Sequence, residues 1–224
     1  MHIEEGIVTG AKLVLGYATA AGAGLWTVKL AAEAVVARGM PAMAARSAMA
    51  TAATLLFFQV LPHYPAGVSE VHLILGSTLF LLFGAAPAAV GLALGLLIQG
   101  LMFAPFDLPQ YGMNVTTLLV PLFAIAALAR RIVAPGTAYV DLSYGQVLKL
   151  SAAFQGGVVG WVAFWAVWGQ GFGADNLAAI GTFGLAYALV MVLEPLVDLA
   201  VLAGAKAARF LRGSALVSER LYAA

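Results

Sequence analysis

The stretch PAAVGLALGLLIQGLMF, residues 87–103, sets the fold class that we expect for this chain. It contains no charged residue, and Gln99 carries its only side-chain amide. A helix that crosses the hydrocarbon core of a bilayer needs about 20 apolar residues, within a range of about 17 to 25. The stretch is long enough, so we expect it to cross a membrane as an α-helix.

The composition of the whole chain extends this expectation. Of its 224 residues, 63% are hydrophobic and 9% are charged, whereas soluble domains have about 25% charged residues. The apolar stretches do not alternate with polar residues as the strands of a membrane barrel do. We therefore expect an all-α, polytopic transmembrane helical bundle that forms a single integral membrane domain, residues 1–224, in the lipid bilayer. About seven spans are expected: 7–36, 43–61, 71–83, 87–103, 115–129, 144–168 and 177–203.

The distribution of basic residues predicts the orientation of this bundle. Lys and Arg are concentrated in cytoplasmic loops. With seven spans, one face holds Arg38, Arg46, Arg130, Arg131, Lys206, Arg209, Arg212 and Arg220. The connections at the other face, residues 62–70, 104–112 and 169–176, contain no Lys or Arg. The N-terminus is therefore expected outside and the C-terminus inside, in the inner (plasma) membrane.

Several chemistries are excluded by what the sequence lacks. Without cysteine there is no disulfide framework, thiolate metal site or thiol nucleophile. No long basic run suggests nucleic acid as a partner, and no bound organic cofactor is predicted. The chain also has no Gly-x-x-x-x-Gly-Lys-Ser/Thr loop for nucleotide phosphates. The start lacks the basic region of a signal peptide, so the N-terminus is expected to be mature as written.

The dipeptide Met1-His2 offers three nitrogens to one metal ion. These are the terminal amine, the His2 amide once deprotonated, and Nδ1 of the His2 ring. Amine and amide close a five-membered chelate ring, and amide and Nδ1 close a six-membered one. A fourth nitrogen would complete a plane, which is typical of Ni(II) or Cu(II), whereas imidazole alone also suits Zn(II) or Co(II). The alternative interpretation of His2 is a disordered terminal residue.

The segment GVSEVH, residues 67–72, supplies the best fourth nitrogen. His72 is expected at the start of the third span, on the face where the N-terminus emerges. Ionisable residues at membrane depth are costly and usually functional. His63, between Pro62 and Tyr64, is expected to be an exposed loop residue, with capture of the ion at the entrance as its alternative role.

These motifs carry a resemblance to a known family. The start Met-His-Ile-x-x-Gly, the later GVSEVHL, and the segments at Gln99 and at residues 112–115 resemble the substrate-binding S component (CbiM/NikM type) of energy-coupling factor transporters for cobalt and nickel. The resemblance implies import of Ni²⁺ or Co²⁺, held by the Met1 amine, the amide and ring of His2, and His72. It also implies a transmembrane T component and cytoplasmic ATPase subunits as partners.

The neighbours of these ligands have weaker expected roles. The resemblance assigns Asn114 the orienting of a ligand through a hydrogen bond, and Ser69 and Gln99 are further candidates for this role. The family's Gly-Gly-Thr-Ser before the histidine is Gly-Val-Ser-Glu here, so that Glu70 either adds an oxygen ligand or makes the local potential more negative.

Some alternatives remain open at this level. A membrane metalloenzyme using the same ligands, or a ligand-free membrane assembly subunit, would share the hydropathy of this chain. In the last span, Glu194 and Asp198 are either functional or paired with Lys206 or Arg209 near the inner end. Trp161, Trp165 and Trp168 are expected to form an aromatic belt at the membrane interface.

Overall fold

A computed structural model describes residues 2–208, and within this part the chain forms seven α-helices and one small antiparallel sheet. The helices are α1 (Leu13–Arg38), α2 (Met40–Gln59), α3 (Gly76–Phe83), α4 (Ala85–Met102), α5 (Tyr111–Ile132), α6 (Tyr144–Gln170) and α7 (Ala174–Ala207). The strands are β1 (Tyr64–Ala66) and β2 (Ser69–Val71), which pair as a hairpin. Short 3-10 helices are η1 (Gly10–Lys12), η2 (Pro105–Gln110) and η3 (Tyr139–Asp141).

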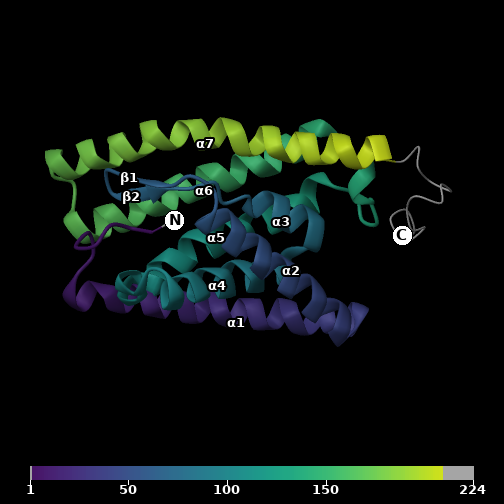
Figure 1. The fold of residues 1–224 in the computed structure, drawn as a ribbon, viewed down its shortest axis with the longest axis horizontal. Coiled ribbons are helices and arrows are strands. Elements are labelled where there is room, and N and C mark those ends of the chain that lie inside the picture. The colour runs from purple at the N-terminus through teal and green to yellow at the C-terminus, as the bar shows by residue number, and fades with distance from the viewer. Residues whose placement is uncertain (1, 209–224) are drawn as a thin grey trace.

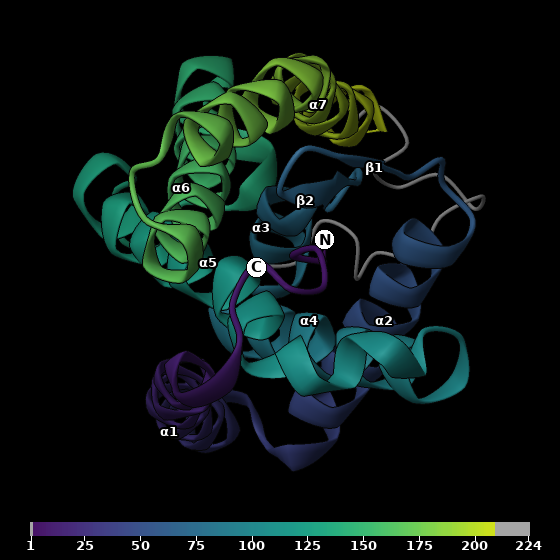
Figure 2. The same cartoon turned by 90° about the vertical axis from the view of Figure 1, so that its left-hand side faces the viewer.

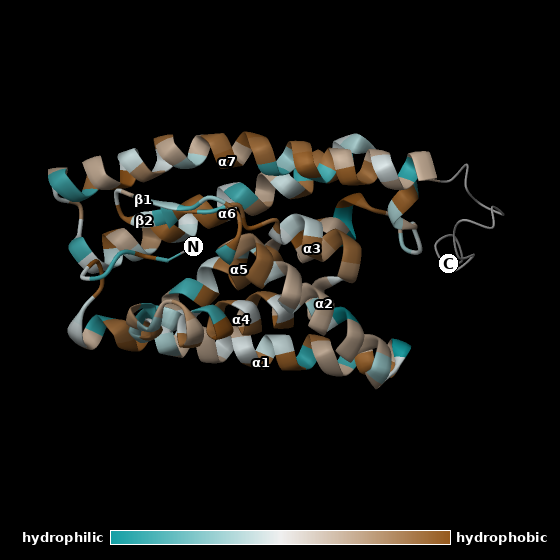
Figure 3. Ribbon diagram, in the orientation of Figure 1, coloured by the Kyte–Doolittle hydropathy of each residue, from teal (hydrophilic) through white to brown (hydrophobic). Residues whose placement is uncertain are grey.

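The helices run along one long axis, with the hairpin near the end where α6 turns into α7 (Figure 1). Five helical segments are long and apolar enough to cross a membrane: Gly10–Arg38, Ala85–Met102, Pro105–Ile132, Tyr144–Gln170 and Ala174–Ala207. The hydrophilic residues gather in the N-terminal segment and at the ends of α1 and α7, and the middle of α7 is hydrophobic (Figure 3). The all-α transmembrane bundle expected from the sequence is therefore confirmed.

The third expected span is wrong in its extent. Its first residues form the end of β2 and a non-helical segment, and α3 itself has 8 residues. A helix of this length is about 12 Å long, too short to cross a bilayer alone. Non-helical backbone at membrane depth is tolerated where protein buries it, and His72, Ile74 and Leu75 are all buried. His72 consequently lies before the helix and not at its first turn.

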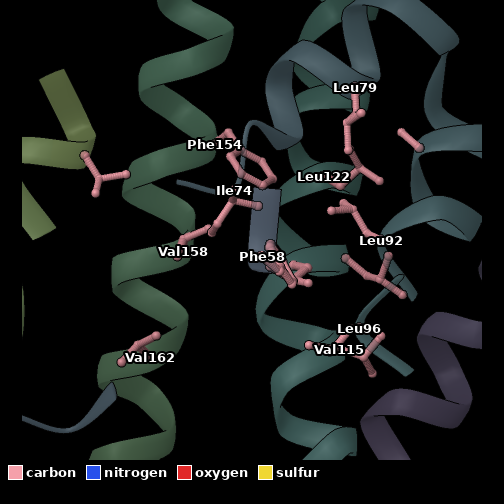
Figure 4. Packing of buried hydrophobic residues seen from close by; sticks show 14 of the residues in the cluster. Phe58, Ile74, Leu79, Leu92, Leu96, Val115, Leu122, Phe154, Val158 and Val162 are labelled. Carbon is pink, nitrogen blue, oxygen red and sulfur yellow. The ribbon is translucent and has the colours of Figure 1, made fainter. Parts of the chain in front are cut away.

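Viewed along the long axis, the hairpin and α3 lie in the middle of the bundle, with the other helices around them (Figure 2). Ile74 packs in the same hydrophobic cluster as Phe58 of α2, Leu92 of α4, Leu122 of α5 and Phe154 of α6 (Figure 4). The segment between β2 and α3 is thus held in place by packing from several helices.

Small residues allow the close approach of α4 to α2. A Cβ atom added to Gly91 would lie 2.4 Å from Cβ of Ala50, and one added to Gly95 would lie 2.6 Å from Cβ of Thr54. Van der Waals packing between small residues is a main source of helix association in lipid. This contact positions Gln99, one turn after Gly95, at the centre of the bundle.

Basic residues of several connections meet at the end of the bundle opposite the hairpin. Arg38 and Arg46 line one cavity together with Thr137 and Tyr139, and Nη1 of Arg46 donates to the Phe83 carbonyl at 3.3 Å. Arg130 and Arg131 lie in the last turn of α5, and Arg130 lines a pocket with Ala85 and Pro135 at this end. Arg209, Arg212 and Arg220 lie outside the described residues.

The aromatic belt expected on α6 is only partly present. Trp168 is exposed, but Trp165 is fully buried and packs in a cluster with Ile3, Val8 and Met113. Trp165 thus supports the N-terminal segment and does not face the membrane interface.

Candidate metal centre

The N-terminal segment joins the hairpin as an additional short strand. Ile3 forms a β-bridge with Ser69, the Glu4 N–H donates to the Val68 carbonyl at 3.1 Å, and the Glu70 N–H donates to the His2 carbonyl at 2.9 Å. The hydroxyl of Ser69 donates to the same His2 carbonyl at 2.8 Å. Backbone pairing therefore fixes His2 beside β2, although some 70 residues separate them in the sequence.

Side chains of α5 and α6 hold this segment from the other side. The Ile3 N–H donates to Oδ1 of Asn114 at 2.9 Å, and both residues are 1% exposed. A Cβ atom on Gly169 would lie 1.9 Å from the Ile7 carbonyl oxygen, so only glycine permits this approach of α6. His2, Ile3 and Val8 are thus buried as part of the core.

The His2 ring is buried between α4 and η2. It is 3% exposed, its Nε2 lies 3.0 Å from Oε1 of Gln99, and its Nδ1 lies 3.0 Å from Oδ2 of Asp107. Within residues 2–208, Nδ1 has no partner that meets hydrogen-bond geometry. Gln99 therefore fixes the orientation of the ring, and Nδ1 is directed toward a carboxylate.

The His72 ring lies next to His2. It is 1% exposed, its Nε2 lies 2.8 Å from Oε2 of Glu70, and the two imidazole centroids are 5.6 Å apart. Burial lowers the pKa of His72 well below its ordinary value. The ring is consequently neutral near pH 7, which is the form that binds a metal ion.

His63 is exposed, as expected, and its ring stacks on His72. The two centroids are 4.9 Å apart and the ring planes differ by 2°. Its Nδ1 lies 3.3 Å from the Leu61 carbonyl oxygen. His63 therefore covers the solvent side of His72.

Potential ligand atoms of His2, Glu70 and His72 all lie within 4.8 Å of one another. Two imidazole nitrogens and a carboxylate oxygen form a donor set that suits divalent first-row transition metals. The structure also brings Ser69, Gln99 and Asn114 into direct contact with the N-terminal segment. Met1 lies outside the described residues, so its amine is not placed.

Sequence reasoning missed Asp107 and Glu4 as neighbours of this cluster. Asp107 is 8% exposed and faces His2 from η2. The pKa of the half-buried Glu4 carboxyl is raised, first by burial and then by the negative charges of Glu70, Asp107 and Glu5. The acidic character of the connection between α4 and α5 was visible in the sequence, but its approach to His2 was not.

The acidic residues of α7 form a second buried polar cluster. Glu194 accepts hydrogen bonds from the Ile74 N–H and from Nε2 of Gln155, and Asp198 accepts from Ser77 and Thr78 of α3. Pairing with Lys206 is therefore wrong, because both carboxylates face α3 and the Lys206 ammonium lies 5.3 Å from the Tyr144 ring centroid. Arg209 lies outside the described residues.

The described residues form an integral membrane helical bundle in which two buried histidines and a partly exposed carboxylate could hold a metal ion. The chain belongs to the CbiM family, cobalt uptake substrate-specific transmembrane region, whose family model matches residues 2–210. The resemblance seen in the sequence is thus confirmed.

Two solved structures share the fold. A crystal structure of a transition metal transporter has a TM-score of 0.70 at 18% identity and covers 99% of this chain and 98% of that chain. A truncated transition metal transporter has a TM-score of 0.67 at 19% identity and covers 91% of this chain and 97% of that chain. Comparison with curated proteins gives no significant match.

Family and fold together define the general role. The protein is a multi-pass membrane component of metal uptake that binds a transition-metal ion as its substrate, and it is not an enzyme. The inner membrane is the usual location of such proteins. The metalloenzyme alternative is therefore wrong.

Proposed function

We propose that this protein is the S component of an energy-coupling factor transporter and binds one Ni²⁺ or Co²⁺ ion from outside through Met1, His2 and His72. The observation that carries this proposal is the convergence of His2, Glu70 and His72, whose ligand atoms lie within 4.8 Å of one another. Packing alone gives no reason for two segments far apart in the sequence to bring two buried histidines and a partly exposed carboxylate together. Buried ionisable groups within a membrane bundle mark sites of substrate binding.

The hydrogen bonds around His2 support chelation through its Nδ1. Oε1 of Gln99 accepts a hydrogen bond from Nε2 of the His2 ring. This contact favours the His2 tautomer that has its proton on Nε2 and a lone pair on Nδ1. Asn114 and Ser69 bind the backbone on either side, at the Ile3 N–H and the His2 carbonyl. These three side chains therefore orient the chelate and do not bind the ion themselves.

Glu70 is proposed to add an oxygen ligand. Two atoms bound about 2.1 Å from one ion at right angles lie about 3 Å apart, and Nε2 of His72 lies 2.8 Å from Oε2 of Glu70. The carboxylate also offsets part of the charge of a buried divalent ion.

Transport needs partners, because the chain has no nucleotide-binding loop. We infer a transmembrane T component and cytoplasmic ATPase subunits. Exposed apolar residues such as Leu185 and Leu189 of α7 and Leu25 of α1 offer surfaces for lipid or for the T component. The proposal keeps a single domain, 1–224, with the hairpin end outside and the arginine-rich end in the cytoplasm, as the distribution of basic residues favours.

Metal titration of the purified, detergent-solubilised protein tests this function. The wild-type chain is expected to bind one Ni²⁺ or Co²⁺ tightly, and His72→Ala is expected to lose this binding while keeping its helical circular dichroism spectrum. A folded wild-type protein without tight binding would support the ligand-free assembly subunit instead.

A further inference from the structure

A cavity of about 250 Å³ lies directly over the proposed metal centre. It is lined by His2, Ile3, Glu4, Glu5, Glu70, Phe106 and Asp107. The carboxylates come from three separate parts of the chain: the N-terminal segment, β2 and η2. Among residues 2–208, no Lys or Arg lines the cavity.

We propose that this cavity is a second, outer cation site, which holds a hydrated divalent metal ion before the ion loses water and reaches His2 and His72. The inference rests on the proposed function, because the outer site would be the entrance to the metal centre at His2 and His72. Its ligands are carboxylate oxygens that receive hydrogen bonds from the water molecules around the ion.

The size of the cavity fits a hydrated ion. A water molecule occupies about 30 Å³ in the liquid, so a divalent ion with six waters needs roughly 200 Å³. The cavity offers about 250 Å³, which exceeds what a bare ion requires. The inner cluster, with ligand atoms within 4.8 Å of one another, has the spacing of direct coordination instead.

Unpaired polar atoms at the cavity point independently to a ligand. His2 is 3% exposed, and its Nδ1 has no hydrogen-bond partner within the described part of the chain. Oε1 of Glu4 is likewise buried without a hydrogen-bond partner among residues 2–208. Buried acceptors without donors are rare in native structures, and waters bound to a cation would donate to both atoms.

Electrostatics favours the same occupant. Glu4, Glu5, Glu70 and Asp107 line one cavity, with no Lys or Arg among the described lining residues, and a divalent cation between these carboxylates lowers their mutual repulsion. Lys12 does not line the cavity, and its ammonium donates to the Gly169 carbonyl at 2.8 Å. Clefts lined by one sign of charge raise association rates of oppositely charged ligands by 10- to 1,000-fold.

The test uses the double variant Glu4→Gln/Glu5→Gln, which keeps the shape of the cavity and removes two charges. Stopped-flow association of Co²⁺ with the full-length protein is measured at low and high salt. Glu33→Gln is the matched control, because this α1 carboxylate pairs with Lys29 and lines a different cavity, the one with Arg38 and Arg46 at the opposite end of the bundle. We expect association of the double variant to be about tenfold slower and less sensitive to salt, while tight stoichiometric binding is kept. Unchanged rates in a folded double variant would overturn the outer site.

A second measurement separates this inference from the proposed function. Mn²⁺ binding to His72→Ala, followed by electron paramagnetic resonance, is expected to show one weak site that disappears when Glu4→Gln/Glu5→Gln is added. No Mn²⁺ binding to folded His72→Ala would refute the outer site even if the wild-type inner centre binds tightly. Loss of tight wild-type binding alone would refute the proposed function and leave the weak site measurable.

Discussion

Glu194 of α7 accepts a hydrogen bond from the backbone N–H of Ile74, two residues after His72. Its other oxygen accepts from Gln155, whose own Oε1 accepts from the Tyr187 hydroxyl at 2.7 Å. One turn later, Asp198 accepts from Ser77 at 2.6 Å and from Thr78 at 2.5 Å. Glu194 therefore binds a backbone amide just before α3, and Asp198 binds two hydroxyls in its first turn, where negative charge is favourable.

Replacing Glu194 tests whether this contact positions His72. Glu194→Ala leaves the Ile74 N–H and the Gln155 amide without their acceptor, at a cost of about 1–3 kcal/mol for each buried group. We expect a lower thermal unfolding temperature and weaker Co²⁺ affinity, whereas Glu194→Gln retains an acceptor for Ile74 and loses less of both. Unchanged affinity in Glu194→Ala would show that the segment holds His72 without this bond.

Extending the chain by one residue before Met1 tests the chelate. The extension removes the free amine from its place next to His2 but leaves His2, His72 and the packing of Ile3 against Trp165 intact. Calorimetric titration is expected to show metal affinity reduced by at least about tenfold, since one nitrogen ligand is lost. If the extended protein binds as tightly as the original, the amine is not a ligand.

Asn114→Ala tests the anchoring of the N-terminal segment. The variant removes the acceptor for the buried Ile3 N–H, and a cost of about 1.4 kcal/mol corresponds to a tenfold loss of metal affinity. Asn114→Asp keeps Oδ1 and is expected to restore part of the binding. Asn176→Ala is a suitable control, because its amide donates only to the Ala166 and Gly171 carbonyls; equal losses in both alanine variants would contradict a specific role of Asn114.

His63→Ala separates the exposed histidine from the buried one. Because His63 stacks on His72 from the solvent side, we expect its removal to leave tight metal binding within about twofold while His72→Ala abolishes it. The comparison needs one titration series under identical conditions. Loss of tight binding in His63→Ala but not in His72→Ala would show that His63 is the fourth ligand.

Glu70→Gln tests the oxygen ligand. The amide keeps the size of the side chain and loses its charge, so we expect Co²⁺ to be bound more weakly, with a smaller effect on Ni²⁺ held in a nitrogen plane. The visible absorption of bound Co²⁺ should change in intensity and position when an oxygen ligand is lost. An identical spectrum would place Glu70 outside the coordination sphere.

Hydropathy made the membrane bundle predictable, because an apolar stretch of sufficient length has few alternatives to a spanning helix. It failed at residues 71–83, where Val71 ends β2 and the equally apolar Leu73, Ile74 and Leu75 lie in a non-helical segment before α3. High hydropathy indicates only that a segment avoids water, and this segment is enclosed by other parts of the protein, not by lipid. Trp165 was misplaced for the same reason, since an apolar ring at a helix end fits either a core or an interface.

The sequence by itself determined the class of protein and suggested the residue types of the proposed metal centre, because the Met-His start and the later histidine motif are local patterns that can be recognised without coordinates. Only the tertiary structure decided which groups surround them. Asp107 approaches His2, Glu194 binds the peptide beyond His72, and Lys206 pairs with neither carboxylate of α7. His2 and Asp107, like Ile74 and Glu194, lie more than 100 residues apart in the sequence, and no local pattern encodes the distance between two such groups.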